Sequence, residues 1–263
     1  MFDINDKKRI VIKVGTSTLT HRTGRLNIRR VEKLVKVLAD LQNSGKEIIL
    51  VSSGSIGLGM SKLGLQSRPT ETTMKQACAA VGQCELMYMY DKLFGEYSIT
   101  VAQILLTRYI LETPRKNNVE NTFQRLIERK VIPVVNENDT VAIDELELEF
   151  GENDSLAAHV AIFSDSDLLI ILSDIDGFYD SNPKINPNAK LIPIVEEIND
   201  EVRGLAGDAI SGLGTGGMIT KINAAELAVN AGVDMAILNG KNPNILYDFF
   251  DGKSIGTVFT TKK

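Results

Sequence analysis

Two kinds of hydrophobic pattern alternate along the chain. Short apolar runs of the kind that form buried strands occupy residues 9–15, 48–51, 100–106, 131–135, 168–172, 233–238 and 256–260. Between them, apolar residues recur at helical spacing over residues 31–41, 55–63, 72–94, 115–128, 154–163, 222–231 and 244–250. Strands that are apolar on both faces and alternate with helices form parallel sheets covered by helices. The pattern therefore predicts an α/β fold, a three-layer α/β/α sandwich with a mainly parallel central sheet.

Two segments depart from this alternation. Residues 141–150 predict a hairpin, and residues 179–193 contain prolines at positions 183, 187 and 193. Strands and helices resume after the second segment, so we expect it to be a loop and not a linker between domains. We therefore expect a single domain over residues 1–263.

Composition narrows the class of protein. The chain is 43% hydrophobic and 24% charged, as globular proteins are, and its net charge of −5 argues against a nucleic-acid partner. Because no apolar run reaches the ~18 residues of a membrane span, we expect no membrane partner and a cytoplasmic location. Cys78 and Cys84 lack metal-site spacing and are expected to be core thiols. His21, in a polar turn, and His159, in a helix, leave few candidates for a histidine general base.

Polar residues follow five of the predicted strands. The carboxyl ends of parallel strands meet at one edge of a sheet, and ligands bind there. Small hydroxyl, amide and carboxylate side chains occur at these ends, in residues 15–18, 52–55, 136–139, 173–177 and 239–241. Such residues also form turns in any protein. Their recurrence at five strand ends nevertheless predicts a shared polar cleft.

A glycine-rich segment, residues 212–221, precedes the helix predicted at 222–231. Closely spaced glycines let backbone N–H groups converge, and a helix N-terminus adds donors and partial positive charge. With the hydroxyls of Thr215 and Thr220 and the charge of Lys221, the segment predicts a polyphosphate site. A plain flexible loop is the alternative. A dinucleotide fingerprint is excluded because no apolar strand precedes the glycines.

Three charged residues indicate that a bound phosphate could take part in phosphoryl transfer. Lys13 lies inside an apolar strand, where a charge is costly unless it is paired; the alternative is an edge or exposed position. Asp154 begins a predicted helix, where it or Asn153 could instead serve as the N-cap. If Lys13, Asp154 and Lys221 converge, Asp154 could orient the two lysines around a transferring phosphoryl group.

Six segments together resemble the amino acid kinase family, and within it the members that phosphorylate glutamate. The matching segments cover essentially the whole chain in the expected order, at residues 11–17, 51–56, 134–139, 151–157, 172–179 and 212–221. Asn136-Glu137-Asn138-Asp139 and the run from Gly214 to Lys221 are the most specific of them. The strand that contains Lys13 is shared with the wider family and discriminates less.

The resemblance implies transfer of the γ-phosphoryl group of ATP to the side-chain carboxylate of L-glutamate, giving L-glutamyl 5-phosphate, the first step of proline biosynthesis. It implies catalytic roles for Lys13, Asp154 and Lys221. It places the acceptor against Ser53, Gly54, Asn136, Asp139 and Asn153, with Asp139 suited to the α-ammonium group. It places ATP against Lys13, Gly15, Ser173, Asp174, Thr215, Gly216, Gly217, Met218, Ile219, Thr220 and Lys221.

The resemblance also implies partners and an organisation. Mg²⁺ would accompany ATP, held mainly by phosphate oxygens and water and not by protein ligands, and a homodimer or homotetramer is expected. Residues 1–165, approximately, would form the amino-acid side and residues 166–263 the ATP side. Many members carry a further C-terminal PUA domain, which we do not expect because the last predicted strand ends close to Lys263. Inhibition by proline and coupling to the next proline-pathway enzyme stay open.

Two rival functions stay open as well. The first is a kinase of the same fold with another acceptor, such as N-acetylglutamate, aspartate, carbamate or UMP. Asp139 argues against an anionic acceptor that has no free ammonium group. The second is a catalytically silent amino-acid sensor. Retention of Lys13, Asp154 and Lys221 argues against a sensor, because sensing does not need the charges of a transfer site.

Overall fold

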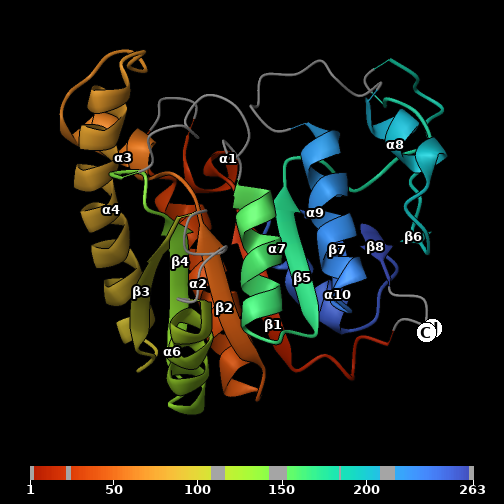
Figure 1. Cartoon of the computed structure of the whole chain (residues 1–263), viewed down its shortest axis with the longest axis horizontal. Coiled ribbons are helices and arrows are strands. Elements are labelled where there is room, and N and C mark those ends of the chain that lie inside the picture. Colours follow the sequence, from red (N-terminus) through yellow and green to blue (C-terminus); the bar gives the residue numbers. More distant parts are fainter. Residues whose placement is uncertain are drawn as a thin grey trace.

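One eight-stranded sheet organises the part of the chain that the computed structural model describes, residues 3–21, 25–107, 116–141, 153–183, 185–207 and 217–260. The strand order is β3-β4-β2-β1-β5-β7-β8-β6 (Figure 1). The strands are β1 (Arg9–Val14), β2 (Glu47–Ser52), β3 (Val101–Leu106), β4 (Ile132–Glu137), β5 (Leu168–Ser173), β6 (Ile194–Val195), β7 (Asp234–Asn239) and β8 (Thr257–Phe259).

The sheet is mainly parallel, which confirms the predicted fold class. The strands β3, β4, β2, β1, β5 and β7 pair in parallel, β8 pairs antiparallel with β7, and β6 pairs in parallel with β8. The reversal before β8 passes through Gly256, which has a φ of +70°. A Cβ atom there would lie 2.3 Å from the carbonyl oxygen of Ile237, so only glycine fits. The two-residue strand β6 is too short to give a periodic signal in the sequence.

Helices cover both faces of the sheet. They are α1 (Thr16–Leu19), α2 (Ile28–Asn43), α3 (Ser55–Lys62), α4 (Thr72–Gly95), α6 (Lys116–Glu128), α7 (Asn153–Phe163), α8 (Asp200–Gly207), α9 (Met218–Asn230) and α10 (Ile245–Phe250). In Figure 1, α7 and α9 lie side by side in front of the sheet and α2 lies behind it. This arrangement gives the three layers that the sequence pattern predicts.

Alternation along β1 divides the core between the two faces. Ile10 and Ile12 pack in the cluster that includes residues of α2, α4 and α10. Val11 packs in the opposite cluster, which includes residues of α6, α7 and α9. Successive side chains of a strand point to opposite faces, so Lys13 lies on the same face as Val11. The fold therefore directs Lys13 toward the helices α7 and α9.

The structure also corrects several details. The helix α9 begins at Met218 and not at Ile222, so the last residues of the glycine-rich segment form its first turn. The helices α1 and α8 were not predicted. Cys78 is buried as expected, but Cys84 is exposed on the same helix. Because α4 carries apolar residues on several sides, its sequence pattern did not show which side faces the core. Of the predicted hairpin, residues 142–150 lie outside the described residues. No helix among the described residues is long and apolar enough to cross a membrane.

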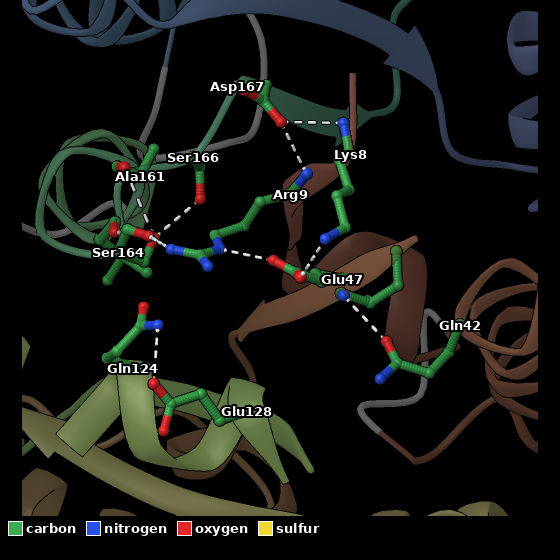
Figure 2. Close-up of polar contacts among 12 residues, drawn as sticks. Lys8, Arg9, Gln42, Glu47, Gln124, Glu128, Ala161, Ser164, Ser166 and Asp167 are labelled. Carbon is green, nitrogen blue, oxygen red and sulfur yellow. Dashed lines mark hydrogen bonds and ion pairs between the residues drawn. The ribbon is translucent and has the colours of Figure 1, made fainter. Parts of the chain in front are cut away.

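A polar network ties the amino-terminal ends of β1 and β2 to the end of α7 (Figure 2). Arg9 donates from Nε to Glu47 Oε2 at 2.8 Å and from its guanidinium to the carbonyl oxygen of Ser164. Asp167 Oδ2 accepts the backbone N–H groups of Lys8 and Arg9, each at 2.8 Å. These contacts fix the amino-terminal edge of the sheet, which leaves the carboxyl-terminal edge as the place for a ligand.

Candidate active site

Two lysines share one buried carboxylate at the carboxyl-terminal edge of the sheet. Lys13 lies near the end of the central strand β1, between β2 and β5, and its Nζ is 2.6 Å from Asp154 Oδ1. Lys221, in the first turns of α9, places its Nζ 3.0 Å from Asp154 Oδ2. The side chain of Asp154 is completely buried. The structure thus brings together the three charged residues that the sequence singled out.

The lysines determine the charge state of Asp154. Burial raises the pKa of this carboxyl, but the charges and hydrogen bonds of Lys13 and Lys221 outweigh burial, and the net pKa lies below its usual value. Asp154 is therefore an anion that positions cations, not a proton acceptor. The alternative of an edge or exposed position for Lys13 is wrong, because Lys13 is only 7% exposed. Thr220 adds a hydroxyl 3.4 Å from Asp154 Oδ2.

Asn153 forms a second, uncharged group beside these charges. Its Nδ2 lies 2.8 Å from the carbonyl oxygen of Ser52, 2.9 Å from Ser53 Oγ and 2.8 Å from Asn136 Oδ1. These contacts join the start of α7 to the ends of β2 and β4. Asn153 and Asn136, with Ser52 and Ser53, form an amide cluster, and Lys13, Asp154 and Lys221 form a charge cluster. The consecutive residues Asn153 and Asp154 therefore link the two clusters.

Asp139 lies just past β4 and faces the start of α3. Its Oδ2 accepts a hydrogen bond from Ser55 Oγ at 3.0 Å. Burial raises the pKa of Asp139, while the Ser55 hydrogen bond and the charge of Arg68 lower it, and the net shift is upward. Gly54 precedes α3 with a φ of +104°, a left-handed conformation that strains other residues. Ser53, Gly54 and Asp139 thus lie around the N-terminus of α3.

The predicted nucleotide contacts lie at the ends of β5 and at the start of α9. Ser173 ends β5 and donates to Asp174 Oδ1 at 3.3 Å, and its carbonyl oxygen accepts the backbone N–H of Gly240 at 2.7 Å. Gly217 is the N-cap of α9, so Met218, Ile219 and Thr220 begin the helix. Gly15 follows β1 beside Lys13. The structure records no contact that joins Ser173 or Asp174 to the lysines, and Thr215 and Gly216 lie outside the described residues.

The sequence interpretation missed two residues of the amide cluster. Gln83, on α4, accepts a hydrogen bond from Asn136 Nδ2 at 2.9 Å. Tyr90, also on α4, places its hydroxyl 2.9 Å from Ser52 Oγ. Both sit within an apolar helical pattern that signalled only core packing. The one available signal was that Gln83 is a polar residue among buried neighbours.

Among the described residues, no group of three or more histidine, cysteine or acidic side chains is arranged to hold a metal ion. Asp154, the carboxylate at the centre of the site, has both oxygens engaged by lysine ammonium groups. The site therefore suits a polyanion that brings its own metal ion, since Mg²⁺ retains phosphate and water ligands readily.

Comparison with known proteins identifies relatives over nearly the whole chain. A model of the amino acid kinase family matches residues 8–239. The chain is 55% identical to the glutamate 5-kinase of Clostridium perfringens, with 99% of this chain and 98% of that protein aligned. It is 52% identical to the glutamate 5-kinase of Listeria monocytogenes, with 99% and 95% aligned.

Solved structures share the fold at much lower identity. The carbamate kinase of Giardia lamblia bound to AMP-PNP superposes with a TM-score of 0.69 at 14% identity, covering 98% of this chain and 99% of that one. The UMP kinase of Ureaplasma parvum gives a TM-score of 0.64 at 16% identity, covering 97% and 99%. The matched residues include both lysines and the buried aspartate. The chain belongs to the amino acid kinase family.

Proposed function

We propose that this chain transfers the γ-phosphoryl group of ATP to the side-chain carboxylate of L-glutamate, giving L-glutamyl 5-phosphate and ADP, the first step of proline biosynthesis. The observation that carries the proposal is the pairing of Lys13 and Lys221 with one buried carboxylate. The names of relatives at 50–55% identity over nearly the full chain give the acceptor.

The charge cluster suits phosphoryl transfer. One carboxylate against two ammonium groups leaves one positive charge in excess in a buried site. In the reaction a glutamate side-chain oxygen attacks the γ-phosphorus, and the bond from that phosphorus to the β–γ bridging oxygen breaks. Lys13 and Lys221 would neutralise the charge on the phosphoryl oxygens, while Asp154 holds both lysines in place. No general base is needed, because the attacking carboxylate is already ionised at neutral pH.

The amide cluster and Asp139 suit the amino-acid end of the acceptor. The carboxylate of Asp139 would pair with the α-ammonium group of glutamate. Ser53, Gly54, Asn136 and Asn153 would hold the rest of the molecule at the ends of β2 and β4. This half of the site comes from residues before 165, and the nucleotide half, apart from Lys13 and Gly15, from residues after 166.

The nucleotide would lie between the end of β5 and the start of α9. Ser173 and Asp174 would contact it on one side and residues 215–221 on the other, with the α9 N-terminus favouring anionic phosphates. Mg²⁺ would enter with ATP and supply a further positive charge to the phosphate oxygens. A cytoplasmic location, a homodimer or homotetramer, and a coupling to the next proline-pathway enzyme are further parts of this proposal.

Trapping the product with hydroxylamine tests the proposal directly. Purified protein and MgATP are incubated with glutamate, N-acetylglutamate or aspartate, and acyl phosphates are measured as coloured iron–hydroxamate complexes. We expect a signal with free glutamate alone. A signal only with another acid would keep the phosphate site but remove the roles assigned to Ser53, Asp139 and Asn153. No signal with any acid, from protein that binds ATP, would favour an amino-acid sensor.

A further inference from the structure

Gln83 is a polar residue placed against the acceptor site by a close contact between α3 and α4. It is 8% exposed, and its neighbours on the same face of α4, Ala79 and Leu86, are buried. A Cβ atom on the adjacent Gly82 would lie 1.7 Å from the carbonyl oxygen of Ser55, so the two helix backbones touch there. Gln83 therefore lies beside the start of α3, which also carries the hydrogen bond to Asp139.

A directional chain of amides begins at Asn153 and ends at Gln83. Asn153 Nδ2 donates to the backbone carbonyl of Ser52, which can only accept, so the amide of Asn153 has one orientation. Asn136 Oδ1 accepts from Asn153 Nδ2 at 2.8 Å, and Asn136 Nδ2 then donates to Gln83 Oε1 at 2.9 Å. Asn136, the middle amide, is therefore oriented by hydrogen bonds to Asn153 on one side and to Gln83 on the other.

The Nε2 group of Gln83 does not stabilise the fold. Gln83 Nε2 is buried and has no acceptor among the described residues, and a buried N–H without a partner is destabilising. An apolar side chain of similar length would avoid that loss. The useful group is therefore Oε1. Without it, the amide of Asn136 could turn over and present N–H groups, in place of its carbonyl oxygen, to Asn153.

We propose that Gln83 is a positioning residue of the acceptor site, which acts on glutamate through Asn136 and Asn153. By fixing Asn136, it keeps Asn136 Oδ1 in place as a second acceptor for Asn153 Nδ2, which the Ser52 carbonyl also engages. Because an amide is planar, Asn153 Oδ1 then lies on the side away from Asn136 and would be available to the ammonium group of the acceptor. The inference rests on the proposed function and identifies a residue on α4 that sets the affinity for glutamate.

A double-mutant cycle between Gln83→Met and Asn136→Ala tests this role. We expect Gln83→Met to raise the KM for glutamate about 3- to 10-fold, the worth of one hydrogen bond, and to leave the KM for ATP unchanged. In the Asn136→Ala background the same substitution should add no further rise, because its effect passes through Asn136. A merely structural role would raise both KM values or lower only the fraction of folded protein.

Gln42→Met is the matched control. Gln42 Oε1 accepts the backbone N–H of Ile48 at 2.9 Å at the opposite edge of the sheet (Figure 2), so both KM values should stay unchanged. Circular dichroism checks that each variant folds. If Gln83→Met does not fold, Gln83→Ala replaces it in the cycle, because alanine adds no atoms and has a high helix propensity.

Two results would overturn the positioning role: an unchanged KM for glutamate in a folded Gln83 variant, or additive effects in the cycle. The wild-type hydroxamate assay separates this failure from failure of the proposed function. An active wild type with an unaffected Gln83 variant overturns the positioning role alone. A wild type that forms no product from glutamate overturns both.

Discussion

Asp154 shows how a single carboxylate pairs with two lysines whose burial would otherwise be costly. A buried lysine is destabilising unless it is paired, and here one carboxylate serves both Lys13 and Lys221. The unbalanced positive charge that remains is useful only when a polyanion arrives. The same arrangement therefore explains why the lysines are tolerated and supports the proposal that the site binds phosphate.

The first prediction at the residue scale concerns Lys221→Ala. We expect kcat to fall about 10²- to 10³-fold, since a charge contact that strengthens in the transition state is lost, with little change in the KM for glutamate. Initial rates of ADP release measure both values. Lys7→Ala is the control, because Lys7 also pairs with a buried carboxylate, Asp234 at 2.6 Å, but at the opposite edge of the sheet. A near-normal kcat for Lys221→Ala would remove its assigned role.

The second prediction concerns the pH dependence of glutamate binding. Burial raises the pKa of Asp139, so the carboxyl becomes protonated at a higher pH than an exposed aspartate, whose pKa is about 3.9. The protonated form cannot pair with the α-ammonium group, and the KM for glutamate should therefore rise as the pH falls. Initial rates are measured between about pH 5 and pH 8, a range that lies above the pKa of the glutamate side chain itself, which is about 4.3.

The variant Asp139→Asn is the matched comparison for that profile. It should have a high KM for glutamate at neutral pH, and the rise at lower pH should disappear, since no carboxylate is left to protonate. The same pH dependence in wild type and variant would assign the titration to another group.

At the scale of the elements, the sequence predicted those that carry a strong periodic signal. The parallel strands were predictable because they are apolar on both faces, and the rule for strand ends then predicted that Ser53, Asn136 and Asp139 lie at one edge of the sheet. Asp154 begins a helix, so its convergence with Lys13 and Lys221 was only a condition of the sequence interpretation. Short elements such as α1 and β6 carry too few residues for a period. Gln83 was not predictable as part of the site, because its partner Asn136 lies 53 residues away and only helix packing brings them together.

The contact between α3 and α4 provides the prediction at this scale. A Cβ atom on Gly59 would lie 1.8 Å from the carbonyl oxygen of Cys78, whereas one on Gly57, in the same helix, would meet nothing within 4 Å. We expect Gly59→Ala to lower the free energy of unfolding by about 1–3 kcal/mol and to raise the KM for glutamate, since α3 carries Ser55.

Gly57→Ala is the control, and it should raise the free energy of unfolding by about 0.4–1 kcal/mol because alanine restricts the unfolded chain. Denaturant unfolding followed by circular dichroism gives both values. Equal effects of the two substitutions would mean that the helices separate easily and that their contact does not position Ser55.

At the scale of the whole molecule, one edge of the sheet carries structural contacts and the other carries the candidate site. The amino-terminal edge is closed by fixed pairs such as Arg9 with Glu47, while the carboxyl-terminal edge holds the excess charge and the buried amides. Asp167→Ala tests this separation, because Asp167 accepts the backbone N–H groups of Lys8 and Arg9 at 2.8 Å. Its loss should lower the free energy of unfolding by about 1–3 kcal/mol and leave kcat and both KM values unchanged. Asp91 is exposed, and Asp91→Ala controls for the loss of a surface charge. A folded Asp167→Ala variant with a lower kcat would show that a change at one edge of the sheet affects the other edge.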